Sequence, residues 1–293
     1  MFIRTYNVNR LIYIRNMHIT NIIDRIKFVT NIIIHKYIFM EYNIIKHTNE
    51  TNRILLTFSP YRTKYILPNI EFPGDNIQLK DSSNKFYFTK NKMKIFKQLT
   101  KLCLHKHVVI LSTSKGGYVS IECAKYLEKF SSKIDIFVFN PMLILDKYTL
   151  DNSAITYPPT PPSLLKFTQE YTENIPNICD ILTDHSFNFI YTYSTKSIID
   201  NLNFEYVKKY VNYYLPINIE SHNCLYPFLK NVDANSKIDC DGYTIATYSK
   251  SDVCEIQKLF GDHTVITLDS LINTQTLFEN NFTLYSYYKP SKN

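Results

Sequence analysis

Apolar runs of strand length recur along this chain and alternate with stretches that have helical spacing. Three of these runs, at 107–112, 134–140 and 187–194, are almost continuously apolar. Strands without apolar–polar alternation are typical of a parallel sheet whose two faces are both buried. Shorter runs at 53–59 and 213–219 extend the series. The pattern therefore predicts an α/β fold.

The segments between these runs have the periodicity of amphipathic helices. Apolar residues recur at roughly helical spacing in 91–104, 116–129 and 198–211. Alternation of strand and helix favours a mostly parallel sheet with helices on both faces. The chain has 293 residues, of which 45% are hydrophobic, so it is long enough to bury a large core. We expect this core to span residues 40–232.

Three further parts flank or interrupt the predicted core. Residues 1–39 form an N-terminal extension, which is native, a targeting segment or the result of a start codon assigned too far upstream. Its most apolar stretch is too short and too polar to span a bilayer. Residues 157–183 begin with a proline-rich stretch and form either a lid over the active face or a surface loop. The sequence of residues 233–293 predicts an α+β appendage that packs on the core.

Glycine is rare in this chain, and its placement is informative. Only five glycines occur, and two of them, Gly116 and Gly117, follow Ser114 in S-T-S-K-G-G at 112–117. A serine in a sharp turn between a buried strand and a helix is presented above the sheet, and the residues two before and two after it must be small. Ser112 and Gly116 meet this requirement, and we expect Gly117 to allow close packing of the helix. A serine-capped helix start is the simpler alternative.

A serine nucleophile in such a turn needs an acid and a histidine, in the order serine, acid, histidine. Asp200 follows the run at 187–194, and His222 follows the run at 213–219. The carboxyl ends of parallel strands meet at one edge of a sheet, so we expect both residues to lie beside Ser114. The rival residues, which are less well placed, are Asp184 as the acid and His185 or His263 as the base.

An oxyanion hole needs two N–H donors near the nucleophile. The backbone N–H of Lys115 is one candidate, because it lies at the start of the helix that follows Ser114. The second donor is expected in the loop after 53–59, where Pro60 has no N–H, so Tyr61 or Ser59 is the candidate. Arg62 in the same loop is either an anion-binding residue or, more simply, a surface arginine.

Charge and cysteine content argue against several other functions. The net charge of +7 is spread along the chain without a dense basic block, so a nucleic-acid groove is not indicated. The six cysteines include no C-x-x-C pair, which is typical of reduced thiols in a cytoplasmic protein. Cys103, His105 and His107 would share one face of a strand, but no fourth metal ligand accompanies them. We expect neither a metal nor a cofactor.

S-T-S-K-G-G at 112–117, Asp200 and His222 together resemble the α/β-hydrolase superfamily, over roughly residues 40–232. The S-K-G-G form of the turn is similar to a branch of bacterial serine esterases and acyl hydrolases, some of which are linked to surface glycans and accessory secretion. The resemblance implies that Ser114 attacks a carbonyl, His222 carries the proton, Asp200 orients the imidazole, and water hydrolyses the acyl-enzyme.

The expected activity is hydrolysis of a carboxylic ester in a small-molecule or glycan-linked acyl substrate. The alternative is an inactive interaction protein that retains the α/β-hydrolase fold, in a surface-glycan or secretion pathway. A third alternative is peripheral association with a membrane through the basic, apolar N-terminus.

Overall fold

The computed structural model describes residues 40–46, 51–67, 72, 74–145, 175–229, 237–240 and 243–260. The chain divides into two compact units, Met1–Phe39 and Met40–Asn293, and all elements given below belong to the second. The expectations for 1–39, for most of the 157–183 segment and for residues beyond 260 lie outside the described residues. The domain boundaries therefore stay predictions.

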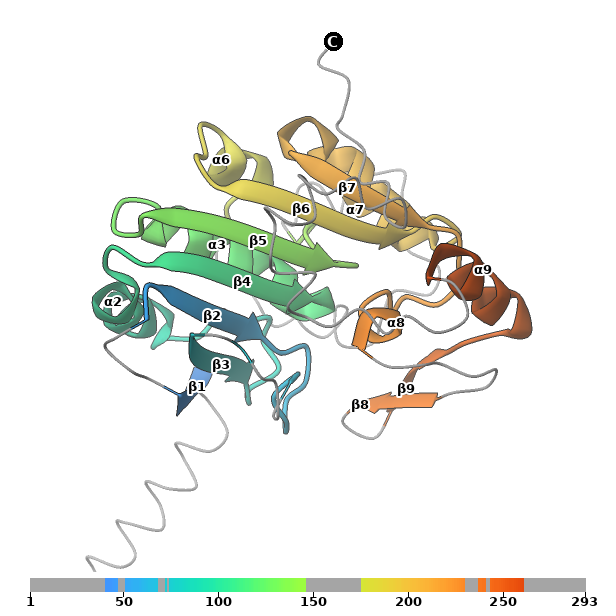
Figure 1. Cartoon of the computed structure of the whole chain (residues 1–293), viewed down its shortest axis with the longest axis horizontal. Helices are drawn as coiled ribbons and strands as arrows, with labels where there is room; N and C mark the ends of the chain where they lie inside the picture. The colour runs from blue at the N-terminus through green and yellow to red at the C-terminus, as the bar shows by residue number, and fades with distance from the viewer. Residues whose placement is uncertain are drawn as a thin grey trace, which may run out of the picture. The chain divides into compact units, whose positions relative to one another are not determined.

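A seven-stranded sheet in the order β1-β3-β2-β4-β5-β6-β7 forms the centre of this unit (Figure 1). The strand β1 runs antiparallel to β3, and all other neighbours are parallel. A separate antiparallel pair joins β8 and β9. The strands are β1 (Met40–Lys46), β2 (Arg53–Phe58), β3 (Asp75–Asp81), β4 (His107–Thr113), β5 (Lys133–Phe139), β6 (Asn188–Ser194), β7 (Tyr213–Ile217), β8 (Lys237–Cys240) and β9 (Tyr243–Thr247).

Helices connect most of the parallel strands and follow the last of them. The α-helices are α2 (Lys92–Cys103), α3 (Gly117–Leu127), α6 (Ile178–Leu182), α7 (Ile198–Val207), α8 (Tyr226–Leu229) and α9 (Lys250–Phe260). Two short 3₁₀ turns are η1 (Ser114–Gly116) and η2 (Lys208–Tyr210). Among the described residues, none of the helices has the length and apolar character needed to cross a membrane.

The predicted α/β pattern is confirmed. The five apolar runs form β2 and β4 to β7, and the three helical segments form α2, α3 and α7. The strand β3 was not predicted, because it reads D-N-I-Q-L-K-D and has no continuous apolar run. Asn76 and Gln78 are nevertheless buried in it. The strands β1 and β8 were also missed, and the polar composition of β8 explains why.

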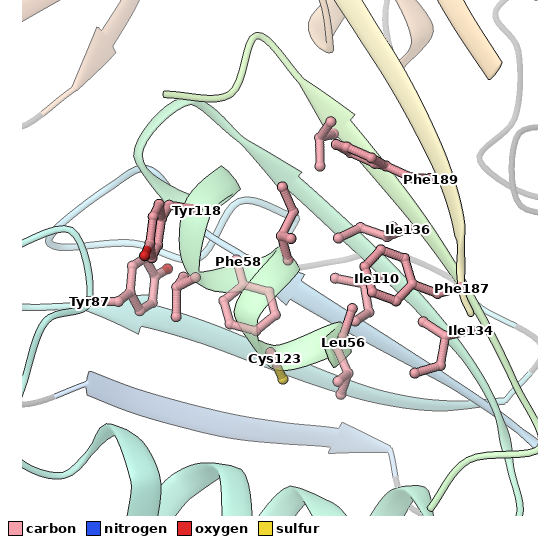
Figure 2. Packing of buried hydrophobic residues seen from close by; sticks show 14 of the residues in the cluster. Leu56, Phe58, Tyr87, Ile110, Tyr118, Cys123, Ile134, Ile136, Phe187 and Phe189 are labelled. Carbon is pink, nitrogen blue, oxygen red and sulfur yellow. The ribbon is translucent and has the colours of Figure 1, made fainter. Parts of the chain in front are cut away.

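The residues of β4 show how the sheet divides its core. Val108 and Ile110 belong to one hydrophobic cluster, which also contains buried residues of α2, α3, α6 and α7 (Figure 2). Val109 and Leu111 belong to a second cluster. Since successive side chains of a strand point to opposite faces, β4 is buried on both faces, as its apolar run predicts.

The second cluster includes residues from the C-terminal part of the chain. Tyr248 and Ile256 are buried in it together with Leu215 and Ile217 of β7. In Figure 1, α8 and α9 lie beyond the arrowheads of the parallel strands. We call the side of the sheet where the parallel strands end its carboxyl edge. The loops after β2, β4, β6 and β7 begin there, and this side is close to α8 and α9.

Candidate functional site

Ser114 lies in the sharp turn that joins β4 to α3. The strand ends at Thr113, Ser114 begins η1, and α3 begins at Gly117. Ser114 has a φ of 48°, in the left-handed region that residues with a side chain rarely adopt. Such strain persists only where the surrounding structure enforces it, and it is concentrated at functional sites.

The two glycines are required by close contacts with other strands. A Cβ atom on Gly116 would lie 2.6 Å from the carbonyl oxygen of Phe58, at the end of β2. A Cβ atom on Gly117 would lie 2.2 Å from Cβ of Pro141, just after β5. The expected close packing at Gly117 is therefore present, and its partner is the chain after the neighbouring strand. The hydroxyl of Ser112, two residues before Ser114, is buried and hydrogen-bonds within the core.

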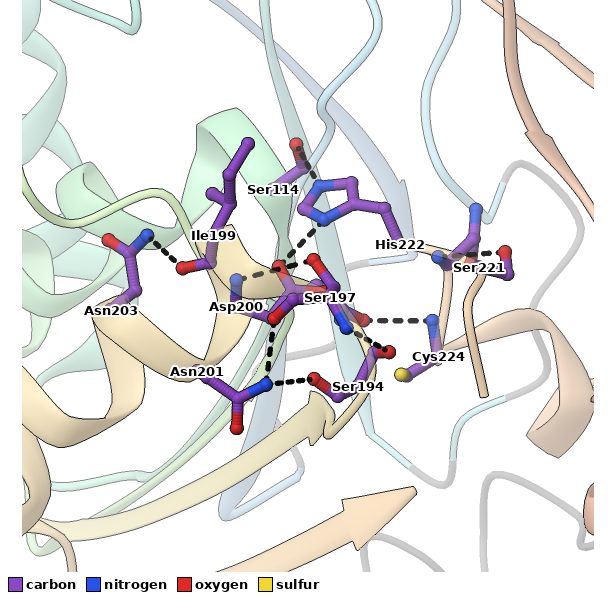
Figure 3. A network of polar contacts seen from close by, with 12 residues as sticks. Ser114, Ser194, Ser197, Ile199, Asp200, Asn201, Asn203, Ser221, His222 and Cys224 are labelled. Carbon is purple, nitrogen blue, oxygen red and sulfur yellow. Dashed lines mark hydrogen bonds and ion pairs between the residues drawn. The ribbon is translucent and has the colours of Figure 1, made fainter. Parts of the chain in front are cut away.

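Ser114, His222 and Asp200 form a continuous chain of hydrogen bonds (Figure 3). Oγ of Ser114 is 3.0 Å from Nε2 of His222, and Nδ1 of the same imidazole is 2.8 Å from Oδ1 of Asp200. The three residues come from the ends of β4, β7 and β6, and 108 positions separate the serine from the histidine. The structure thus brings together the three residues that the sequence analysis selected.

Asp200 occupies the first turn of α7, the helix that follows β6. Ser197 caps this helix, and its Oγ accepts a hydrogen bond of 3.3 Å from the N–H of Asp200. The carboxylate is fully buried, so it needs polar partners to offset desolvation. The position at a helix N-terminus also favours its negative charge.

Asn140 provides one of these partners, and the sequence analysis did not identify it. Its Nδ2 donates a hydrogen bond of 2.6 Å to Oδ2 of Asp200, and its Oδ1 accepts one of 2.8 Å from the N–H of Cys224. Asn140 is buried and has a φ of 46°, which asparagine tolerates better than most residues. The available signal was a polar residue at the carboxyl end of the buried strand β5.

The pKa of His222 is raised above its ordinary value of 6.5. Burial alone lowers it, but the negative charge of Asp200 and the hydrogen bond to its carboxylate outweigh this effect. The imidazole side chain keeps 26% of its surface exposed, whereas the carboxylate of Asp200 is inaccessible. An imidazole in this arrangement accepts a proton from Ser114 readily, because the resulting cation is stabilised by the carboxylate.

The expected second oxyanion donors are engaged in other hydrogen bonds. The N–H of Ser59 donates to the carbonyl of Leu79 at 2.9 Å, and the N–H of Tyr61 donates to Oγ of Ser59 at 3.1 Å. An oxyanion would have to displace one of these bonds, so the assignment of this donor stays a prediction. Lys115 lies in η1, two residues before α3 begins, and its Nζ donates to Oδ1 of Asn84 at 2.7 Å.

The rival residues do not approach Ser114 in the described part of the chain. Asp184 and His185 precede β6, at the opposite edge of the sheet, where Nδ1 of His185 is 2.7 Å from the carbonyl of Leu182. His263 lies outside the described residues. Cys103 ends α2, so it does not share a strand with His107. The described residues contain no group of three or more side chains that could hold a metal ion.

No protein-family model matches the sequence, and no curated protein matches it. A solved structure that is similar in part is a capsule O-acetyltransferase of Neisseria meningitidis serogroup A, in complex with caged gadolinium. The similarity has a TM-score of 0.41 and 13% sequence identity, and it covers 58% of this chain and 77% of that chain. Since a likeness this weak carries no argument about activity, the proposals below rest on the geometry of this chain.

Proposed function

We propose that this protein is a serine hydrolase that cleaves a carboxylic ester through a Ser-His-Asp triad. The observation that carries the proposal is the hydrogen-bonded sequence of Ser114, His222 and Asp200, with distances of 3.0 and 2.8 Å. Nucleophile, base and orienting acid within hydrogen-bond reach are the mark of an activated serine. The positive φ of Ser114 adds the strained strand-to-helix turn of a nucleophile elbow.

In this mechanism, Oγ of Ser114 attacks the ester carbonyl while its proton passes to Nε2 of His222. Asp200 holds the imidazole through Nδ1 and stabilises the imidazolium that forms. The tetrahedral intermediate collapses when His222 returns the proton to the leaving alkoxide, which departs as an alcohol. Water then attacks the acyl-enzyme with His222 as base, and the products are a carboxylic acid and free Ser114. These steps need no cofactor.

Stabilisation of the oxyanion needs two N–H donors near Ser114. The N–H of Lys115 follows the nucleophile in η1, directly before the N-terminus of α3, where the helix dipole favours negative charge. The loop of Ser59 and Tyr61 follows β2, the strand next to β4, and is the proposed source of a second donor. We propose that binding of the substrate exchanges one of the hydrogen bonds of this loop for a bond to the oxyanion.

The broader assignment is to the α/β-hydrolase fold, with helices on both faces of the sheet. It is supported by the parallel order of β3-β2-β4-β5-β6-β7 and by the two hydrophobic clusters that residues of β4 enter. The proposed substrate is a small molecule or a glycan that carries an acyl group.

A fluorophosphonate probe, which phosphonylates activated serines, tests the proposal directly. We expect wild-type protein to be labelled and Ser114→Ala to be unlabelled and inactive on p-nitrophenyl esters. Ser132→Ala is the matched control, since this serine is exposed at the opposite edge of the sheet. Folded wild-type protein that resists labelling would contradict the proposal and favour the inactive interaction protein.

A further inference from the structure

The loop that carries His222 is held from two sides. We define the His222 loop as residues 218–225, between β7 and α8. On the side of the sheet, Oγ of Ser194 donates to the carbonyl of Ile219, and Oδ1 of Asn140 accepts from the N–H of Cys224. These bonds fix the two ends of the loop, but neither involves a neighbour of the histidine.

Two further hydrogen bonds to this loop come from the C-terminal part of the chain. The N–H of Glu220 donates to Oδ1 of Asp252 at 2.7 Å. The carbonyl of Asn223 accepts a hydrogen bond of 2.6 Å from the hydroxyl of Tyr248. One bond thus lies two residues before His222 and the other lies one residue after it.

Asp252 is itself fixed in the first turn of α9. Its Oδ2 accepts from the N–H of Ser249 at 3.2 Å, and Oγ of Ser249 accepts from the N–H of Asp252 at 3.1 Å. This reciprocal pair is a capping box at the start of α9. Because each carboxylate oxygen receives a separate N–H, the side chain holds Glu220 at a set position relative to the helix.

Tyr248 and Asp252 are both fully buried. The ring of Tyr248 packs in the second hydrophobic cluster with Cys224 and Leu225, so its hydroxyl is aimed at the loop by the packing of its ring. A buried carboxylate is tolerated only with hydrogen-bond partners. Asp252 has two such partners, since Oδ2 completes the cap of its own helix and Oδ1 accepts the N–H of Glu220.

We propose that residues 248–252 are a brace for the His222 loop, with Tyr248 and Asp252 as positioning residues that keep the imidazole aligned with Ser114. This role rests on the proposed hydrolase activity and gives a function to part of the C-terminal appendage. The brace acts on the transition state, because a small displacement of the base weakens proton transfer more than substrate binding.

Tyr248→Phe is the most selective test, because it removes one hydroxyl and keeps the buried ring. With a p-nitrophenyl ester we expect kcat to fall about tenfold at unchanged KM. The matched control is Tyr118→Phe, since the hydroxyl of Tyr118 is buried and donates to the carbonyl of Pro176, also at 2.6 Å. The control should lower the thermal unfolding midpoint by a similar amount and leave kcat unchanged.

Asp252→Asn tests the other contact. The amide would present an NH₂ group to one of two N–H donors, so it cannot hold both Glu220 and Ser249. We expect a loss of kcat of at least tenfold, whereas Gln257→Glu, at an exposed position of the same helix, should retain wild-type kcat. Should Asp252→Asn fail to fold, Tyr248→Phe alone decides the matter.

A readout that does not depend on catalysis separates this proposal from the hydrolase proposal. In protein with ¹⁵N-labelled histidine, the proton between His222 and Asp200 should give a far-downfield NMR signal, assigned by its loss in His222→Gln. We expect this signal to shift or broaden in Tyr248→Phe and to stay unchanged in Tyr118→Phe. An unchanged signal with unchanged kcat in Tyr248→Phe overturns the brace. If wild-type protein proves inactive, the hydrolase proposal fails, and the NMR signal alone decides whether the brace exists.

Discussion

At the scale of single residues, the site depends on one imidazole between a serine and a buried carboxylate. His222 must be neutral to accept the proton of Ser114. The charge and hydrogen bond of Asp200 outweigh burial and raise its pKa above 6.5. The same carboxylate therefore orients the base and increases its affinity for the proton.

The pH dependence of activity follows from this shift. We expect kcat/KM for a neutral ester to fall below a pKa that is higher than 6.5, the ordinary value for histidine. In Asp200→Asn, the acidic limb should move to lower pH and the maximal rate should fall. A limb at the same pH in both proteins would show that another group controls it.

Protonation of His222 should affect the stability of the fold in the opposite direction to its effect on activity. The free energy of unfolding should fall as the pH rises, whereas kcat/KM should increase. A pKa that is raised in the folded state means that the fold binds the proton more tightly than the unfolded chain does. This contribution is fully present below pH 6.5 and is lost as the pH rises through the raised pKa of His222. Unfolding in urea at several pH values, compared between wild type and His222→Gln, measures it.

Substitution of Asn140 tests whether its hydrogen bond to Asp200 supports the site. In Asn140→Ala, Oδ2 of Asp200 and the N–H of Cys224 lose their partner, and the loss of a hydrogen bond to a charged group is worth about 1.5–3 kcal/mol. We expect kcat/KM to fall about 10- to 100-fold. Asn188→Ala is the control, because Asn188 makes the same 2.6 Å bond to buried Asp135 at the opposite edge. The control should lose comparable stability but no activity.

At the scale of elements, the turn between β4 and α3 determines where Ser114 lies. Gly116 lies against the end of β2, and Gly117 lies against the chain after β5. The helix can therefore approach the sheet only if neither position has a side chain. Two of the five glycines are used at one strand-to-helix junction for this reason.

Gly117→Ala should destabilise the protein, although alanine is the better helix former. The new Cβ would lie 2.2 Å from Cβ of Pro141, and overpacking of this kind costs about 1–3 kcal/mol. We expect a lower midpoint in urea unfolding. A double-mutant cycle with Pro141→Gly, which removes the opposing atom, should recover part of the loss, and strict additivity would show that the two positions do not interact.

At the scale of the whole molecule, the two edges of the sheet have different roles. The carboxyl edge holds the candidate site, and the opposite edge holds buried ion pairs. Asp135, at the start of β5, accepts hydrogen bonds from Asn188 and Lys133 and lies 2.6 Å from Nε2 of His107. Burial raises its pKa, but these partners outweigh burial and lower the pKa to about 2.

This carboxylate should contribute to acid unfolding. Because the pKa of Asp135 is lower in the folded state, its contribution is present above 3.8 and is lost as the pH falls from 3.8 towards about 2. A shift of this size corresponds to a contribution on the order of 2 kcal/mol. Asp135→Asn should therefore flatten the stability curve in this range, while esterase activity at neutral pH stays at the wild-type level.

The sequence by itself predicted the order of the main elements. It also selected Ser114, Asp200 and His222, the three residues that the structure brings together. Continuous apolar runs identify buried parallel strands because both faces of such strands must be covered. Chain order and the ends of those runs were enough to select Asp200 and His222, since parallel strands place their carboxyl ends at one edge. The strand β3 was not predicted, because its polar residues are typical of an exposed segment although most of them are buried.

Only the tertiary structure decided how these three residues are held in place. Asn140 follows a buried strand and Asp252 belongs to a capping box, but no local pattern shows which distant residues these two side chains and Tyr248 contact. Asn140 and Asp200 are separated by 60 positions, and Glu220 and Asp252 by 32. A hydrogen bond between distant segments depends on the packing of whole elements, whereas a strand or a capped helix depends on neighbouring residues. The sequence therefore specifies which residues form the candidate site, and the fold specifies their alignment.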